Sequence, residues 1–100
     1  MDNSINLKNK NVLVTGGSRG IGAGIAKAMA ACGANVLINY RSHKESAAEL
    51  SDFLQKEYVV KTASFCADIS KKEEVEKMFL YADEHFGSID ILVNNAGCES

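Results

Sequence analysis

The 100-residue sequence contains no proline and no tryptophan. The lack of proline is compatible with a run of regular elements but excludes little by itself. Strong charge of one sign is also lacking, because 11 Lys and Arg against 13 Asp and Glu give a net charge of -2. Without a basic field, nucleic acid is not an expected partner. No apolar run is long enough for a membrane span, and residues 1–8 lack the apolar core of a secretion signal, so we expect neither.

Cysteine is sparse and scattered. Cys32, Cys66 and Cys98 form no C-x-x-C pair and have no neighbouring histidine ligands. We therefore expect three reduced thiols in a cytoplasmic protein and no metal site. The hydrophobic content of 46% and charged content of 24% are near the averages for soluble globular domains. A chain of this length allows one small domain at most.

Apolar runs that are typical of buried parallel strands alternate with helical patterns along the chain. The expected strands are Asn11–Thr15, Val36–Tyr40, Val59–Cys66 and Ile89–Asn94. This β-α-β-α-β-α-β order predicts an α/β fold, a Rossmann-like doubly wound parallel sheet that is truncated after the fourth strand. In the expected strand order 3-2-1-4, the fourth strand lies at an edge and one face carries only the third helix.

The three helices have recognisable ends. The first is expected from Gly20 to Cys32, before Gly33 at the position that favours a left-handed residue. The second and third are expected to begin with capping boxes at Ser42 and Ser70, each followed by Glu three residues later. Gly87 should end the third. The predicted apolar face of the first helix is Ile21, Ile25, Ala28, Met29 and Cys32, and that of the third is Val75, Met78, Phe79, Ala82 and Phe86.

The strongest chemical signal is the segment Thr15–Gly22, which reads Thr-Gly-Gly-Ser-Arg-Gly-Ile-Gly between the first strand and the first helix. Gly16 permits a tight turn, Gly20 lets the backbone approach a pyrophosphate, and Gly22 lets the helix pack closely. The helix N-terminus would then face the phosphates. A glycine-rich turn without a ligand is the alternative. A P-loop is excluded because no Gly-Lys-Ser/Thr ending is present.

Three motifs together resemble the short-chain dehydrogenase/reductase family. They are the glycine segment, the Asn94–Gly97 run Asn-Asn-Ala-Gly, and Asp68 after the third strand. The resemblance is greatest to 3-oxoacyl-acyl-carrier-protein reductases, with glucose 1-dehydrogenases close behind. It implies an NAD(P)-dependent oxidoreductase that acts on a carbonyl or alcohol substrate.

The end of the second strand bears on the choice of cofactor. An acid there would bind the ribose 2′-hydroxyl of NAD, but this chain has Asn39–Ser42, without a carboxylate. Arg41 offers a guanidinium to a 2′-phosphate, and Arg19 offers a second positive charge. Either arginine can instead be an ordinary solvated side chain. These residues favour NADPH, and NADH remains open.

The resemblance assigns further residues to the cofactor. It implies that the Asp68 carboxylate accepts from the adenine amino group beside the Ile69 backbone, and that Asn95 borders the ribose. A helix cap is the alternative for Asp68, and a turn former is the alternative for the asparagines. The expected cofactor-binding residues are Gly16, Ser18, Arg19, Gly20, Ile21, Gly22, Tyr40, Arg41, Ser42, Asp68, Ile69, Asn95, Ala96 and Gly97.

In the family, the catalytic Ser and Tyr-x-x-x-Lys lie downstream of the Asn-Asn-Ala-Gly motif, so no catalytic residue is expected here. Tyr40 and Lys44 have that spacing, but they lie on the adenine side, away from the nicotinamide. We therefore expect the cofactor-binding half of a longer reductase, which the resemblance implies is a homotetramer. The alternative is a non-catalytic dinucleotide-binding module or sensor. An S-adenosylmethionine methyltransferase is disfavoured, because Arg41 stands where an acid is usual.

Overall fold

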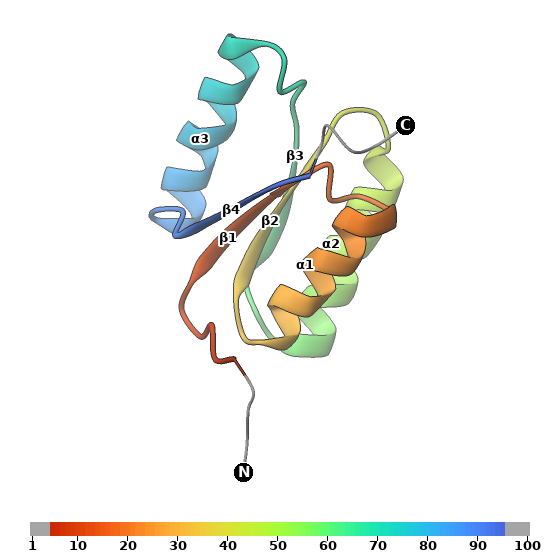
Figure 1. The fold of residues 1–100 in the computed structure, drawn as a ribbon, viewed down its shortest axis with the longest axis vertical. Coiled ribbons are helices and arrows are strands. Elements are labelled where there is room, and N and C mark those ends of the chain that lie inside the picture. Colours follow the sequence, from red (N-terminus) through yellow and green to blue (C-terminus); the bar gives the residue numbers. More distant parts are fainter. Residues whose placement is uncertain (1–4, 96–100) are drawn as a thin grey trace.

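The computed structural model describes residues 5–95, which form alternating strands and helices around one parallel sheet (Figure 1). The elements are β1 (Asn11–Thr15), α1 (Gly20–Ala31), β2 (Asn35–Tyr40), α2 (Lys44–Tyr58), β3 (Thr62–Cys66), α3 (Lys72–Phe86) and β4 (Ile91–Asn94). The four strands are ordered β3-β2-β1-β4. All three pairings are parallel. The predicted fold class and strand order are confirmed.

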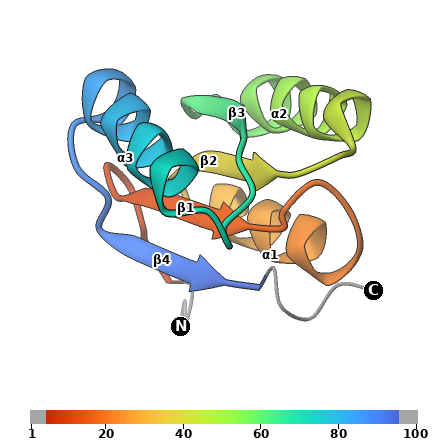
Figure 2. The ribbon, with the colours of Figure 1, turned by 90° about the horizontal axis from the view of Figure 1, so that it is seen from above.

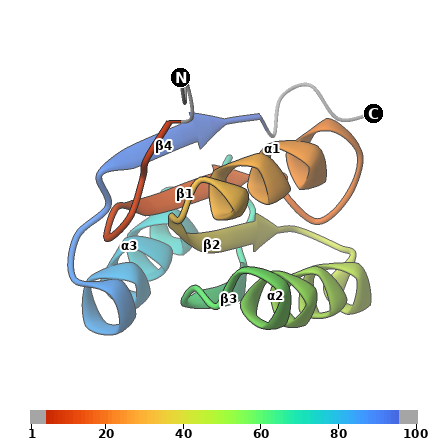
Figure 3. The same ribbon diagram turned by 90° about the horizontal axis from the view of Figure 1, so that it is seen from below.

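The sheet is covered on both faces, with α1 and α2 on one side and α3 on the other (Figures 2 and 3). Successive residues of a strand point to opposite faces, and the buried strands follow this rule. Val12 and Val14 of β1 pack in the cluster that includes α1 and α2 residues. Leu13, between them, packs with Met78, Ala82 and other α3 residues. Val12–Val14 of β1 and Val36–Ile38 of β2 are therefore apolar on both faces, as the sequence pattern predicted.

The predicted strand bounds need three corrections. β2 begins at Asn35 rather than Val36. β3 begins at Thr62 rather than Val59, because Val59 ends α2 in a left-handed conformation with φ of 54°. β4 begins at Ile91 rather than Ile89. Asp90, just before it, donates its main-chain N–H to the Asn11 carbonyl and accepts the Asn11 N–H on its carboxylate at 2.8 Å. That paired contact fixes where β4 joins β1.

The buried face of α1 differs from the prediction. Its buried residues are Gly22, Ala26 and Ala30, whereas Ile21 is 72% exposed. Ile25 and Met29 of the predicted stripe are partly buried against the same core, whereas Ala28 is exposed, so the predicted face is confirmed only in part. The smallest residues take the fully buried positions, and at Gly22 a β-carbon would clash with the turn after β1. The α3 prediction is confirmed, since Met78, Ala82 and Phe86 are buried.

Both predicted capping boxes are wrong. The N-cap residues are His43 for α2 and Lys71 for α3, and no side chain caps either helix. Ser70 instead donates its hydroxyl to Asp68 Oδ1, and Glu74 rather than Glu73 reaches back to accept the Asp68 N–H. The connection before α3 is thus a local turn built around Asp68, of the kind in which an Asp side chain bonds its own backbone two residues on.

β4 is an edge strand of the described sheet, as expected (Figure 2). Leu92, which pairs with Leu13, is 53% exposed on the α3 face. None of the helices between residues 5 and 95 has the length and apolar character to cross a membrane. Within the same residues, no group of His, Cys, Asp and Glu side chains is placed to hold a metal ion.

Candidate functional site

The expected site residues that the structure describes lie at or after the carboxyl ends of the strands, which meet at one edge because the strands are parallel. The chain runs from β1 outward to β2 and β3, then returns to place β4 on the other side of β1. In open α/β sheets, ligands bind at such a topological switch point. The segment between β1 and α1 borders it, and so does Asn95, which follows β4.

The turn after β1 is held by two asparagine side chains. Gly16 has a positive φ of 61°, which favours glycine. Its N–H donates to Asn39 Oδ1 at 3.2 Å, and its carbonyl accepts from Asn95 Nδ2 at 3.2 Å. The Gly17 N–H donates to the Asn39 carbonyl at 2.9 Å. The first two amides of the glycine segment therefore hold the turn itself and are not the donors that a phosphate would meet.

The N-terminus of α1 has the character of an anion site. Gly20, its first residue, has a φ of 62°, and the preceding Arg19 is extended. No side chain caps this helix, and its first turn contains no acidic residue. By contrast, α2 and α3 carry Glu residues in their first turns. The first N–H groups of a helix have no acceptor within the helix, and the helix dipole favours negative charge there.

Gly22 is the point of closest packing in this region. A β-carbon built on it would lie 2.2 Å from the Gly16 carbonyl oxygen and 2.7 Å from Asn95 Nδ2. The start of α1 thus packs against the turn after β1 and against the residue after β4. Of the other segment residues, Ser18 is buried, whereas Arg19, Gly20 and Ile21 are exposed.

The end of β2 provides one buried and two exposed residues. Tyr40 is buried in the cluster with α1 and α2 residues, whereas Arg41 and Ser42 are exposed. Desolvation raises the pKa of the Tyr40 hydroxyl, and the charge of an ionised Cys66 raises it further. A general acid that works through a Tyr–Lys pair needs the opposite shift. That Tyr40 and Lys44 are not a catalytic pair stays a prediction, and this direction of the Tyr40 pKa is compatible with it.

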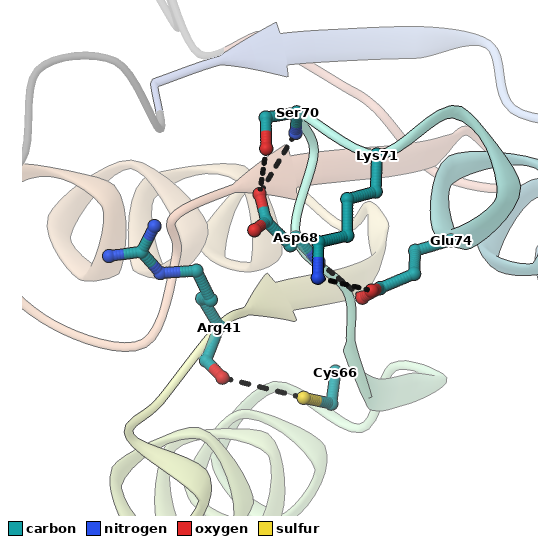
Figure 4. Close-up of polar contacts among 6 residues, drawn as sticks. All are labelled: Arg41, Cys66, Asp68, Ser70, Lys71 and Glu74. Atoms are coloured by element: carbon teal, nitrogen blue, oxygen red, sulfur yellow. Dashed lines mark hydrogen bonds and ion pairs between the residues drawn. The ribbon is translucent and has the colours of Figure 1, made fainter.

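Asp68 lies after β3 within a small polar network (Figure 4). Its Oδ1 accepts from the Ser70 hydroxyl at 2.7 Å and from the Ser70 N–H at 3.0 Å. These two bonds, and then the positive charges of Arg41 and Lys71, hold the pKa of Asp68 below its ordinary value of 3.8. Glu74 accepts the Asp68 N–H at 2.8 Å and pairs with Lys71 at 3.9 Å. Ile69, next to Asp68, is exposed.

We expect the substitution Ser70→Ala to raise the pKa of Asp68. The pKa of Asp68 is lower in the folded protein than in the unfolded chain. The charged carboxylate therefore stabilises the fold at pH values above the unfolded pKa, and this stabilisation is lost as the pH falls through the folded pKa. Removing the hydroxyl donor should shift that loss to higher pH. Carboxyl NMR titration measures the shift directly. Ser46→Ala, on the exposed side of α2, should leave the Asp68 titration unchanged, and an equal shift in both variants would contradict the assignment.

The residues after β4 are described only to Asn95, which is buried. Besides its bond to Gly16, Asn95 donates its N–H to Thr15 Oγ1 at 2.9 Å. Thr15 Oγ1 also lies 3.2 Å from Asn94 Oδ1 and 3.3 Å from the Val93 carbonyl. The asparagine motif therefore joins the end of β1 to the end of β4. Ala96 and Gly97, which were also expected at the site, lie outside the described residues.

Two residues that shape this edge had no role in the sequence interpretation. Asn39 is 2% exposed and holds both amides of the Gly16–Gly17 turn. Glu74 holds the Asp68 backbone. Asn39 was detectable, because a polar residue inside the apolar run of a buried strand must have hydrogen-bond partners. Glu74 was not, because the neighbouring Glu73 fits a capping box equally well.

A parallel sheet of this order, with a glycine turn leading into an uncapped helix, defines a Rossmann-type nucleotide-binding fold. The family profile described as short chain dehydrogenase matches residues 10–100. The chain therefore belongs to the short-chain dehydrogenase family.

Individual relatives agree with this assignment. The chain is 44% identical over 93 residues to a D-beta-hydroxybutyrate dehydrogenase of Cupriavidus necator, covering 93% of this chain and 35% of that protein. It is 46% identical over 93 residues to 3beta-hydroxysteroid dehydrogenase 1 of Eggerthella lenta, again covering 93% of this chain and 35% of the relative. The chain thus spans about a third of the length of these relatives.

Solved structures show the same fold. An L-sorbose reductase from Gluconobacter frateurii, complexed with NADPH and L-sorbose, superposes with a TM-score of 0.89 at 31% identity, covering 97% of this chain and 36% of that one. A short chain dehydrogenase from Burkholderia cenocepacia in complex with NADP gives a TM-score of 0.84 at 40% identity, covering 89% of this chain and 36% of that one.

Proposed function

We propose that the protein is an NADPH-dependent oxidoreductase and that residues 1–100 form its NAD(P)-binding Rossmann domain. When bound, the cofactor supplies or accepts the hydride that converts a carbonyl into an alcohol or the reverse. The observation that carries the proposal is the uncapped, acid-free N-terminus of α1 after a turn that is fixed on both sides by asparagines. Such a site presents backbone N–H groups and positive helix dipole to a pyrophosphate.

In this proposal, residues from four connections each hold one part of the dinucleotide. The Ser18–Gly22 amides face the pyrophosphate, while Gly16 shapes the turn. Arg41 and Ser42 lie at the adenosine ribose beside Tyr40, and Arg19 adds positive charge. Asp68 holds the adenine amino group next to Ile69. Asn95, with Ala96 and Gly97, borders the other ribose.

The preference for NADPH rests on charge. Arg41 is exposed, and residues 41–43 between β2 and α2 include no carboxylate to repel a 2′-phosphate. The positive charge of Arg41 helps to lower the pKa of Asp68, which supports an Arg41 guanidinium on the proposed adenosine side (Figure 4). The solved relatives that hold NADPH or NADP support the same choice. NADH is the expected weaker alternative.

For the substrate, we propose a 3-oxoacyl thioester, as in 3-oxoacyl-acyl-carrier-protein reductases. The glycine segment and the Asn94–Gly97 motif resemble that group most closely. One relative is named for D-beta-hydroxybutyrate, a 3-hydroxy acid of the type that reduction of a 3-oxoacyl group yields. We further propose a cytoplasmic homotetramer, with the catalytic Ser, Tyr and Lys supplied from outside these 100 residues.

The test uses the intact protein with NADPH, NADH and three substrates. NADPH binding, followed by its fluorescence, should be at least about tenfold tighter than NADH binding, since one charge-assisted contact contributes about 1.5–3 kcal/mol. Loss of NADPH absorbance should be faster with acetoacetyl thioester than with a ketose or a 3-oxosteroid. Failure to bind either dinucleotide would contradict the proposal. Faster turnover of another substrate would contradict only its substrate part.

A non-catalytic dinucleotide-binding module is the second candidate. The observation in its favour is that, within residues 5–95, the one Tyr with a Lys four positions later is buried in the core. NADPH binding of normal strength without turnover of any carbonyl or alcohol would establish this candidate instead.

A further inference from the structure

The buried Asn39 amide touches two segments that would hold different parts of the dinucleotide. Its Oδ1 accepts the Gly16 N–H at 3.2 Å, in the turn that leads to α1. Its Nδ2 donates to the Ala67 carbonyl at 3.0 Å, and Ala67 directly precedes Asp68. One side chain thus bridges the phosphate side and the adenine side of the candidate site.

The Asn39 amide can adopt only one orientation here. The oxygen faces an N–H donor, while the nitrogen faces the carbonyls of Ala67 and Tyr40. A flipped amide would oppose donor to donor and acceptor to acceptor. The side chain is 2% exposed, so water cannot replace a lost partner without rearrangement.

The main chain strengthens both ends of this bridge. The Asn39 carbonyl accepts the Gly17 N–H at 2.9 Å, and the Tyr40 carbonyl accepts the Ala67 N–H at 2.9 Å. The end of β2 therefore fixes two consecutive residues of the turn after β1 and both polar groups of Ala67. The positions of the α1 N-terminus and of Asp68 are set relative to each other through this point.

We propose that Asn39 is a positioning residue that couples the pyrophosphate and adenine subsites, so that ordering one subsite orders the other. The expected effect of Asn39 on cofactor binding rests on the proposed dinucleotide-binding function. Because its side chain is buried, Asn39 would act through its neighbours and not by contact with the cofactor. It holds both segments in place before binding, so less conformational entropy is lost when the ligand binds. A preorganised site gains affinity in this way.

The matched pair of variants is Asn39→Leu and Asn35→Leu. Asn35 lies on the same strand at the opposite end of the sheet, and its amide also bridges two neighbours. It donates to Asn11 Oδ1 and accepts the Lys61 N–H, each at 3.0 Å. Asn39→Leu loses three hydrogen bonds and Asn35→Leu loses two, neither gains charge, and only Asn39→Leu loses them at the candidate site.

For the intact protein, we expect Asn39→Leu to weaken NADPH binding about tenfold to hundredfold, and Asn35→Leu to change it less than about twofold. Amide hydrogen exchange on the unliganded protein provides a readout independent of binding. Asn39→Leu should accelerate exchange in both residues 16–22 and residues 67–71. Asn35→Leu should accelerate it around Lys61 and leave both segments unchanged.

Acceleration confined to residues 16–22 would overturn the coupling, and so would equal loss of NADPH affinity in both variants. If the unsubstituted protein bound no dinucleotide, the proposed function would fail. The exchange pattern alone would then uphold or overturn the link between the two segments.

Discussion

Gly22→Ala should lower the free energy of unfolding by about 2–4 kcal/mol and weaken NADPH binding at least about a hundredfold. The added β-carbon would lie 2.2 Å from the Gly16 carbonyl oxygen, and that atom belongs to the backbone. No rotamer change can relieve such a contact, so the start of α1 must move away from the turn. The same movement displaces the first-turn amides that are proposed to hold the pyrophosphate. Urea unfolding and a cofactor fluorescence titration measure the two effects.

Gly24→Ala is the matched control for this substitution. It lies two residues later in the same helix, and a β-carbon there would meet nothing within 4 Å. Alanine is favoured over glycine in a helix interior, so this variant should be more stable by about 0.5–1 kcal/mol. Its affinity for NADPH should not change. If Gly22→Ala bound NADPH as tightly as Gly24→Ala, the close packing at Gly22 would have no bearing on the site.

The fold was predictable because its signals are local and repeated. Buried parallel strands carry apolar residues on both faces, so the apolar runs at β1 and β2 could be recognised as strands from their own residues. The face of α1 was not predictable in the same way. Ile21 is 72% exposed and Ile25 is only partly buried, whereas the smaller Gly22, Ala26 and Ala30 are buried. The distance between a helix and the sheet depends on the side chains of both. The periodicity of the helix sequence alone therefore does not predict it.

The candidate site shows the same division. The glycine segment predicted a turn and a helix start at the positions where the structure has them. The hydrogen bonds that hold the turn come from Asn39 and Asn95, which are 23 and 79 positions from Gly16. Sequence spacing cannot pair such residues before the strand order is known. The sequence before α3 is compatible with a capping box of Ser70 and Glu73 and with a turn in which Asp68 bonds Ser70 and Glu74. The structure has the turn with Glu74.

Arg41→Asp should reverse the proposed cofactor preference. The substitution removes a charge-assisted donor to the 2′-phosphate and puts a carboxylate where it would repel that group, so NADPH binding should weaken by about 10²–10³. NADH binding should stay the same or improve, because a carboxylate at this position can accept from the ribose 2′-hydroxyl. Titrations of both cofactors at low and high salt measure the change. Salt should weaken NADPH binding more in the unsubstituted protein than in the variant.

Lys56→Asp makes the same charge change at an exposed position in the last turn of α2, away from the carboxyl ends of the strands. It should alter neither cofactor affinity, which separates a local contact from a change in net charge. Asp68 supplies an independent readout, because Arg41 contributes to holding its pKa down. In Arg41→Asp the pKa of Asp68 should rise, whereas Lys56→Asp should not affect it. If the Asp68 pKa rises but the preference for NADPH persists, Arg41 faces Asp68 alone and the 2′-phosphate is recognised elsewhere, with Arg19 the next residue to substitute.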